Sequence, residues 1–369
     1  MKKILFIFGT RPEAIKLFPL ILESKKNLVS DIKLFCTGQH DKALEEIYEI
    51  FNTYPDLTLN LKRKNNSLSE LSSLLLDNTN KAINKYKPDL VVVHGDTSSS
   101  FIGALNAFYN KIDIAHIEAG LRTGDVYSPF PEEINRSFIS KIASYNFCPT
   151  NISKKNLIKE GLSSNKIYIV GNTVIDAVLS INKRIETNKV LSNSLQKKFN
   201  KPMSFKERIL ITIHRRENWG ERLNEMLETF KHLAQINPDI SFIFSVHPNP
   251  SLNKKIRASL KGFKNIFLLK PQNYISFVFL MKNVDLIYSD SGGIQEEATS
   301  LNKNVCILRD HTERPEVLAT GLVFLVGTSR QGILEGMKNL SKPLESISYP
   351  FGKGDASKKI IKVLHKNGY

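Results

Sequence analysis

The sequence has 369 residues, of which 41% are hydrophobic and 24% are charged. This mixture is typical of a globular protein of about two domains, and it excludes a disordered chain or a collagen-like fibre. The formal net charge of +16 favours acidic partners such as phosphates, nucleotides, nucleic acid or an anionic membrane surface. The charge does not choose among these partners, and solvated surface lysines explain it equally well.

The cysteines and the N-terminal residues indicate the cellular setting. Cys36, Cys148 and Cys306 form no C-x-x-C pair and have apolar neighbours, which predicts small core side chains and a reducing cytoplasm. The apolar run after Met1 ends at Gly9, which is too short for a signal peptide. No stretch reaches the ~18 apolar residues of a membrane span, so we expect no membrane insertion.

The first half of the chain alternates short apolar runs with longer amphipathic segments. Strands are predicted at residues 3–8, 31–36, 89–94, 112–117 and 145–148, and helices at 13–24, 41–51, 99–109 and 132–144. Because several strands are apolar on both faces, the pattern predicts a parallel sheet covered by helices.

The same alternation restarts after Gly171-Asn172-Thr173. Strands are predicted at 208–213, 240–246, 266–269, 285–288 and 305–308, and helices at 224–235, 275–281 and 294–301. The boundary between the halves is least defined at 170–205, and a last helix at 355–366 belongs to neither pattern. The predicted fold class is α/β, with two doubly wound halves.

Two polar turns follow predicted strands, where open α/β sheets bind their ligands. GTRPEAIK, residues 9–16, opens a helix with Arg11 and Lys16 nearby, which suits a phosphate, although a plain turn with exposed basic residues has the same pattern. In DSGGIQEE, Gly292 and Gly293 let backbone N–H groups approach an anion closely. The carboxylates that follow suit a ribose diol, or they complement the helix dipole.

Carboxylates follow neighbouring strand ends in the first half. They are Asp96 in HGDT, Glu118 in HIEAGLR, and Glu132 or Glu133 in PEEINR. At one sheet edge, repulsion and burial would move their pKa values toward neutrality and support general acid/base catalysis. Capping and salt bridging explain any one of them more simply, but three together favour catalysis.

Histidine and arginine follow strands of the second half. His214 in HRREN could bind or protonate a leaving phosphate, His247 follows the next strand, and Arg314 in TERPE is a further phosphate candidate. No metal-ligand spacing such as H-E-x-x-H occurs, so we expect no metal. The basic motifs and the glycine turn therefore indicate a nucleotide diphosphate, and the carboxylates indicate proton transfer on the group it carries.

Eight motifs occur in an order that defines a family resemblance. GTRPEAIK, HGDT, HIEAGLRTGD, SPFPEEINR, GNTVID, HRREN, SDSGGIQEEA and TERPE make the chain resemble, from about residue 3 to 355, the non-hydrolysing UDP-N-acetylglucosamine 2-epimerases. The resemblance implies a GT-B architecture with Rossmann-like domains at 1–173 and 174–352 facing a cleft, and a C-terminal helix, about 353–369, packed on the first. It also implies a cytoplasmic homodimer of polysaccharide biosynthesis without cofactor, metal or nucleic acid.

The resemblance implies a reaction and a set of site residues. The family interconverts UDP-GlcNAc and UDP-ManNAc by removing the C2 proton, eliminating UDP to a 2-acetamidoglucal and re-adding UDP with a proton on the opposite face. Asp96, Glu118 and Glu132 would be the acid/base residues, and His214 would assist the diphosphate. The implied substrate-binding residues are Arg11, Lys16, Arg136, Gln272, Phe277, Ser291, Gly292, Gly293, Glu297 and Arg314. Among them, Glu297 would take the ribose hydroxyls and Phe277 would lie near the uracil.

Other functions stay open at this point. One is a hydrolysing epimerase that releases UDP, and another is an epimerase for a different UDP-acetamido sugar. A third is a glycosyltransferase or a basic nucleic-acid-binding protein of the same fold. Bacterial members often have an allosteric UDP-GlcNAc pocket, and its retention here also stays open, because Gln39-His40-Asp41-Lys42 lacks the second glutamine.

Overall fold

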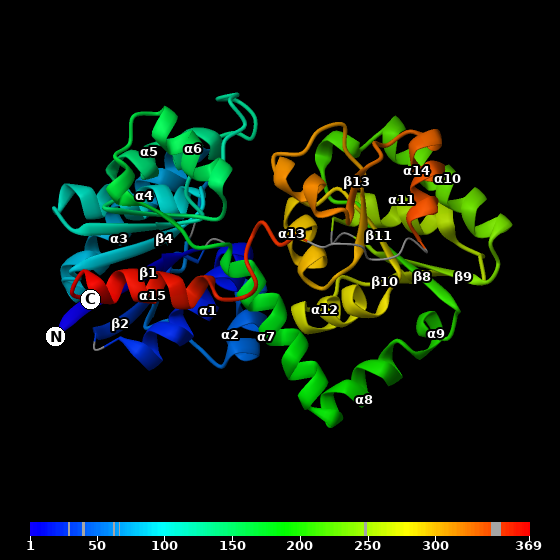
Figure 1. The fold of residues 1–369 in the computed structure, drawn as a ribbon, viewed down its shortest axis with the longest axis horizontal. Helices are drawn as coiled ribbons and strands as arrows, with labels where there is room; N and C mark the ends of the chain where they lie inside the picture. Colours follow the sequence, from blue (N-terminus) through cyan, green and yellow to red (C-terminus); the bar gives the residue numbers. More distant parts are fainter. Residues whose placement is uncertain (29, 39–40, 62, 66, 247–248, 341–347) are drawn as a thin grey trace. The chain divides into compact units, whose positions relative to one another are not determined.

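The computed structural model describes residues 1–369 except 29, 39–40, 62, 66, 247–248 and 341–347. The chain divides into two compact units (Figure 1). The first contains Met1–Ala177 and Phe351–Tyr369, and the second contains Val178–Pro350. The chain therefore leaves the first unit once and returns to it for its last residues.

The first unit is built on a parallel sheet in the order β3-β2-β1-β4-β5-β6-β7. Its strands are β1 (Lys2–Phe8), β2 (Ser30–Cys36), β3 (Leu57–Thr58), β4 (Leu90–His94), β5 (Asp113–Ile117), β6 (Tyr145–Cys148) and β7 (Ile167–Ile169). Its helices are α1 (Arg11–Asn27), α2 (Asp41–Phe51), α3 (Leu68–Tyr86), α4 (Ser98–Tyr109), α5 (Glu132–Ile142), α6 (Asn151–Lys159), η1 (Ser164–Lys166) and α15 (Ala356–Lys366). Helix α15 packs against α1 (Figure 1).

The second unit repeats this plan with the parallel order β10-β9-β8-β11-β12-β13. Its strands are β8 (Glu207–Thr212), β9 (Ile240–Ser245), β10 (Ile266–Leu269), β11 (Leu286–Ser289), β12 (Asn304–Ile307) and β13 (Val323–Leu325). Helix α7 (Thr173–Thr187) leads into it, followed by α8 (Lys189–Lys198), α9 (Asn200–Met203), η2 (Arg216–Asn218), α10 (Glu221–Ile236), α11 (Pro250–Leu260), α12 (Tyr274–Asn283), α13 (Gly292–Ser300), η3 (Pro315–Thr320), α14 (Arg330–Gly336) and η4 (Met337–Asn339).

Strands β4, β9, β11 and β12 are buried along their whole length, which is why they are mainly apolar. All five residues of β4 are buried, and in the second unit Phe230 of α10 packs edge-on against Phe244 of β9 and Tyr288 of β11. Two-sided burial excludes alternating polar residues and favours the parallel βα arrangement. The predicted α/β class is confirmed.

The strand order of each sheet reverses at one place. In the first unit, β1 and β4 are neighbours, with β2 and β3 added on the side of β1 and β5 to β7 on the side of β4. In the second unit, β8 and β11 are the corresponding neighbours. Turns that follow such strands diverge and leave room for a ligand beyond their carboxyl ends. The GTRPE and HGDT turns flank the first reversal, and the HRREN and SDSGG turns flank the second.

Several elements were missing from the sequence prediction. The longest is α3, although Ser67 caps it by accepting from the backbone of Glu70 and its buried Leu71 and Leu75 have helical spacing. Strands β3, β7 and β13 have only two or three residues, which is too short for a period-of-two pattern. The ill-defined stretch at 170–205 contains α7, α8 and α9.

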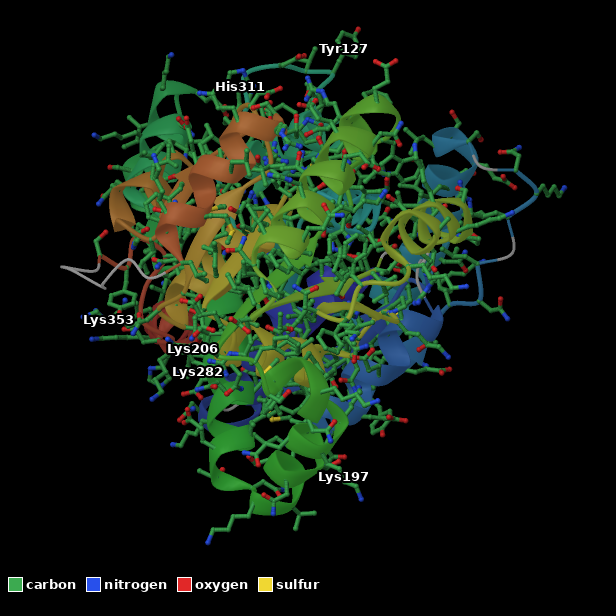
Figure 2. All side chains as sticks on the ribbon, turned by 90° about the vertical axis from the view of Figure 1, so that its right-hand side faces the viewer. Tyr127, Lys197, Lys206, Lys282, His311 and Lys353 are labelled. Carbon is green, nitrogen blue, oxygen red and sulfur yellow. The ribbon has the colours of Figure 1, made fainter. Side chains whose placement is uncertain are left out.

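The structure bears on two predictions from composition, the location of the cysteines and the origin of the positive charge. All three cysteines are free and buried, which confirms the prediction of small core side chains. Lys197, Lys206 and Lys353 are exposed, and Figure 2 shows them extending from the surface, so part of the positive charge is solvated. Within the described ranges, no helix combines the length and the apolar character needed to cross a bilayer.

Candidate active site

The turn between β1 and α1 is held by the buried carboxylate of Glu13. This side chain is 2% exposed and accepts from the backbone N–H groups of Gly9 and Thr10, at 3.1 and 2.8 Å. It also accepts from the hydroxyls of Thr97 and Ser100, both at 2.7 Å, in the segment that follows β4. Glu13 thereby joins the two turns that flank the strand reversal, a role that the sequence analysis did not assign.

The two predicted basic residues of this turn point to different partners. Arg11 lies 3.5 Å from Glu46 of α2 through Nη2, and its Nε is buried without a hydrogen-bond partner in the described part of the chain. Lys16, one turn further along α1, contacts Glu118 through a short hydrogen bond between Nζ and Oε2. The helix therefore presents one cation to α2 and the other to a predicted acid/base residue.

Glu118 has an unusual backbone and a dense set of side-chain contacts. It follows β5 with a φ of +64°, a left-handed conformation that costs free energy in a non-glycine residue. Its carboxylate is 8% exposed, and Oε2 accepts from Lys16 and from Asn172 Nδ2, at 2.6 Å for the latter. His94 Nε2 lies 3.8 Å from the same oxygen. Burial lowers the pKa of His94 to about 4, so its ring is neutral at pH 7.

Asp96 combines an arginine partner with a raised pKa. Arg136 Nη2 of α5 lies 2.6 Å from Asp96 Oδ2, and the backbone carbonyl of Asp96 accepts from Asn135. Burial raises the pKa of Asp96 to about 6 against the opposing charge of Arg136, and the charges of Glu118 and Glu132 raise it further. These interactions place the carboxylates of Asp96, Glu118 and Glu132 in one cluster.

Glu132 and Glu133, left open by the sequence, have different surroundings. Glu133 is buried, and its Oε1 accepts from the backbone N–H groups of Thr123 and Gly124, which fixes the loop after β5. Glu132 is half-buried, and its negative charge contributes to the raised pKa of Asp96. Of the two, Glu132 therefore belongs to the carboxylate cluster.

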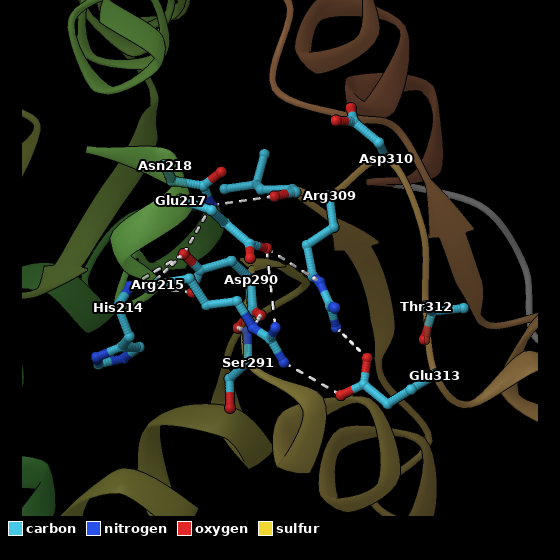
Figure 3. A network of polar contacts seen from close by, with 12 residues as sticks. His214, Arg215, Glu217, Asn218, Asp290, Ser291, Arg309, Asp310, Thr312 and Glu313 are labelled. Atoms are coloured by element: carbon cyan, nitrogen blue, oxygen red, sulfur yellow. Dashed lines mark hydrogen bonds and ion pairs between the residues drawn. The ribbon is translucent and has the colours of Figure 1, made fainter. Parts of the chain in front are cut away.

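In the second unit, Asp290 ties together the turns after β8 and β11 (Figure 3). Its side chain is fully buried and accepts from the backbone N–H groups of His214 and Arg215, and from Asn218 Nδ2 at 2.8 Å. The Nε of Arg215 donates to the backbone carbonyl of Asp290 at 3.1 Å. This carboxylate fixes the backbone of predicted His214 beside the glycine turn, and the sequence analysis missed it.

The glycine turn opens α13 in close contact with predicted Arg314. A side-chain carbon at Gly292 would lie 2.5 Å from Arg314 Nη1 and 2.8 Å from Glu313 Oε1, so a larger residue would displace these two side chains. Arg314 is buried, and its Nε contacts Glu296 in a short ion pair. Ser291 and Gly293 are half-buried on either side of Gly292. The arginine side chain therefore lies directly over the helix start.

The other predicted residues of the second unit lie on α12 and α13 or just before them. Glu297 is buried and accepts from the hydroxyl of Tyr274 at 2.8 Å. Phe277 is half-buried on α12, and Gln272 donates to the carbonyl of Lys270 at 2.6 Å. Glu296 and Glu297 thus both have partners within the unit, and sequence spacing gave no signal for Tyr274.

Glu313 gathers arginines around one carboxylate (Figure 3). Arg309 and Arg314 approach it at 2.5 and 2.7 Å, and Arg215 Nη2 lies 3.1 Å away. Burial alone would raise the pKa of Glu313, but the three cations together lower it to about 2. Glu313 thereby holds the three arginine side chains next to the glycine turn.

Some predicted positions lie outside this description. His247 is outside the described residues, as are Gln39 and His40 of the stretch compared with the allosteric pocket. Among the residues that are described, no group of three His, Cys, Asp or Glu side chains is arranged to hold a metal ion.

The geometry and the comparisons together identify the class of protein. Each doubly wound unit carries a polar cluster at its strand reversal, carboxylates in one and arginines with a glycine turn in the other. Both clusters follow the carboxyl ends of strands, where open α/β sheets bind their ligands, and grouped carboxylates suit general acid/base catalysis in an enzyme. The sequence profile of the UDP-N-acetylglucosamine 2-epimerases matches residues 23–365.

Individual relatives cover nearly the whole chain. The UDP-N-acetylglucosamine 2-epimerase of Escherichia coli strain K12 is 40% identical over 371 residues, 99% of each chain. The crystal structure of the Neisseria meningitidis UDP-GlcNAc 2-epimerase bound to UDP-GlcNAc is 42% identical with a TM-score of 0.93, covering 99% of this chain and 100% of that one. The Methanocaldococcus jannaschii enzyme in complex with UDP-GlcNAc and UDP is 38% identical with a TM-score of 0.86, covering 99% of this chain and all of that one.

The chain therefore belongs to the UDP-N-acetylglucosamine 2-epimerase family. It is an epimerase, an enzyme of the isomerase class, with the GT-B type of α/β units. The predicted family, fold class and enzyme class are confirmed.

Proposed function

We propose that the enzyme interconverts UDP-GlcNAc and UDP-ManNAc by eliminating UDP to a 2-acetamidoglucal and adding it back with a proton on the other face of C2. The carboxylate cluster of the first unit carries this proposal. Asp96, with its pKa raised to about 6, can exchange a proton near neutral pH, whereas an ordinary carboxyl stays ionised.

We assign the proton transfers to Asp96, Glu118 and Glu132. Glu118 is held by Lys16 and Asn172, and a fixed carboxylate can act at one face of the sugar without reorganising. Arg136 supports Asp96 through their 2.6 Å contact.

The second unit supplies the groups that we assign to uridine diphosphate. The C2 hydrogen is only weakly acidic, so negative charge developing on the leaving diphosphate must be stabilised. Arg314 and the backbone of Ser291, Gly292 and Gly293 suit that charge, because a helix start and an arginine both attract phosphate. His214, fixed by Asp290, would assist from the turn after β8.

The remaining groups recognise the nucleoside and complete the anion site. We assign the ribose hydroxyls to Glu297, whose orientation the Tyr274 hydroxyl supports, and the uracil to Phe277 and Gln272. Arg11, at the start of α1, is the remaining phosphate candidate. No cofactor or metal enters the proposed steps.

Domain organisation and assembly are part of the proposal. We take the two units as the two domains, with the C-terminal helix belonging to the first. A homodimer is supported by the exposed aromatic rings of Phe108, Tyr109 and Phe138 on α4 and α5. A cytoplasmic location is supported by the free buried cysteines.

Solvent isotope exchange tests the reaction. UDP-GlcNAc incubated in D₂O should acquire deuterium at C2 in both epimers, with free UDP well below stoichiometric. Epimerisation without solvent deuterium would contradict proton transfer at C2, and stoichiometric UDP with free ManNAc would establish the hydrolysing alternative. A panel of UDP-acetamido sugars tests the substrate.

Variants test the residue assignments. Asp96→Asn and Glu118→Gln should each lower exchange about 100-fold or more. Asp31→Asn is the matched control, because Asp31 lies at the amino-terminal end of β2 and pairs only with Lys33 among the contacts described. Wild-type exchange in both cluster variants would remove the carboxylate assignment.

A further inference from the structure

The GNTVID segment is one of the motifs that carry the family resemblance, but the proposed reaction gives it no role. It occupies residues 171–176, between β7 and α7. The chain passes to the second unit after Ala177, inside α7, and returns to the first unit at Phe351. The segment therefore lies immediately before one of the two places where the chain passes between the units.

Asn172 connects this segment to Glu118. Its side chain is 2% exposed, and Nδ2 donates to Glu118 Oε2 at 2.6 Å. Its Oδ1 accepts from the backbone N–H of Val174 at 3.1 Å, which orients the amide so that the NH₂ faces the carboxylate. A side-chain amide can accept from the backbone through its oxygen and donate to the carboxylate through its NH₂ group at the same time.

The same residue binds the returning chain. The backbone N–H of Asn172 donates to the carbonyl of Phe351 at 2.8 Å. Gly171 has a φ of +92°, and a side-chain carbon there would lie 2.7 Å from the Phe351 carbonyl oxygen, so only glycine permits this approach. Asp176 accepts from the backbone N–H groups of Ala356 and Ser357, at 3.2 and 2.9 Å, and fixes the start of α15.

We propose that Asn172 is a positioning residue that holds the Glu118 carboxylate in its reactive orientation and links it to both passages of the chain between the units. A displacement of the chain at Phe351 or at the start of α7 would move the donor of Glu118. A change in the conformation of either passage would therefore alter the orientation of the Glu118 carboxylate. This inference rests on the proposed role of Glu118.

The left-handed backbone of Glu118 explains why such a holder is needed. A strained backbone persists only where surrounding contacts determine it, and Asn172 and Lys16 provide those contacts at the carboxylate. The charged and titratable groups that face Glu118 are Lys16 from α1, His94 at the end of β4, Asp96 in the next turn and His116 in β5. None of these groups lies in the segments where the chain passes between the units. Among the named contacts, only Asn172 therefore connects Glu118 to those segments.

Two substitutions at Asn172 test the inference. Asn172→Ala removes the donor and should lower kcat about 10- to 100-fold, while KM for UDP-GlcNAc stays within about threefold. Removing a hydrogen bond to an ionised carboxylate raises its pKa, so the limb of the pH–rate profile that disappears in Glu118→Gln should move to higher pH. Asn172→Asp keeps the shape but places a second carboxyl beside Glu118. Its kcat should be lower still at pH 8 and recover as the pH falls and the pair binds a proton.

Controls separate positioning from stability and from the chemistry itself. Asn106→Ala removes another buried amide of the first unit, which donates to the Leu76 carbonyl, and should leave kcat and the pH profile unchanged. UDP affinity, measured by calorimetry, should be unchanged in both Asn172 variants. If Glu118→Gln retains full exchange, the proposed role of Glu118 fails. If Glu118→Gln is inactive but Asn172→Ala and Asn172→Asp keep wild-type kcat and pH profiles, the positioning role is overturned.

Discussion

Arg136→Gln should shift the pH dependence of the enzyme. Arg136 Nη2 lies 2.6 Å from Asp96 Oδ2, and its charge opposes the burial that raises the pKa of Asp96 to about 6. An adjacent cation lowers a carboxyl pKa by about 1–3 units, so removing it should raise the pKa of Asp96 to about 7–9. Ionised Asp96 would then fall from about 90% at pH 7 to between about 1 and 50%.

The assay is the pH profile of kcat/KM, measured by deuterium incorporation at C2. If ionised Asp96 is required, the acid limb near pH 6 moves upward, and activity lost at pH 7 returns at higher pH. If protonated Asp96 is required instead, its titration appears as the alkaline limb of the profile, and that limb also moves to higher pH. Arg122→Gln is the matched control, because Arg122 pairs with Glu160 and does not contact Asp96. A limb that stays in place or moves to lower pH in Arg136→Gln would refute the electrostatic reasoning.

Three further variants test the second unit. Asp290→Asn should lower kcat about 10- to 100-fold with little change in protein fold, because it replaces an acceptor of the His214 backbone N–H by a donor; unchanged kcat would contradict this. Glu313→Gln should lower the free energy of unfolding by about 3 kcal/mol at pH 7, because it removes the carboxylate that the arginines stabilise. Measured by urea unfolding, this difference should shrink as the pH falls below 4.5 toward 2. A difference that does not depend on pH would argue against the electrostatic explanation. Tyr274→Phe should raise KM about 3- to 10-fold with kcat within twofold, since it removes only the donor to Glu297, and a wild-type KM would exclude that support.

The sheet architecture was predictable because its signal is local. Runs such as Leu90–His94 are buried on both faces and are therefore continuous in the sequence. The same rule placed Asp96 and Glu118 together, since parallel strands end at one edge of their sheet. Helix α3 was missed although its signal was present, in the cap at Ser67 and the spacing of Leu71 and Leu75.

The supporting residues were not predictable, because their partners are remote in the sequence. Asn172 meets Glu118 across 54 positions, and Asp290 meets the backbone of His214 across 76. Neither contact follows from a period or a turn signature, and each depends on which strands become neighbours in the sheet. Chemistry-bearing residues stand in recognisable motifs after strands, whereas the side chains that orient them are identified only when the turns are brought together.

Two carboxylates of this protein show why the direction of a pKa shift separates catalysis from stability. The pKa of Asp96 rises from 3.8 to about 6, so the stability of the folded state is full below pH 3.8 and falls as the pH rises to 6, a cost of about 3 kcal/mol at neutral pH. The pKa of Glu313 falls from 4.5 to about 2, so it contributes a similar amount above pH 4.5 that is lost on acidification. Ionised Asp96 costs the fold free energy at pH 7 even though Arg136 pairs with it, which supports the proton-transfer role that we propose for this carboxylate. Glu313, by contrast, is explained by the arginines that it holds.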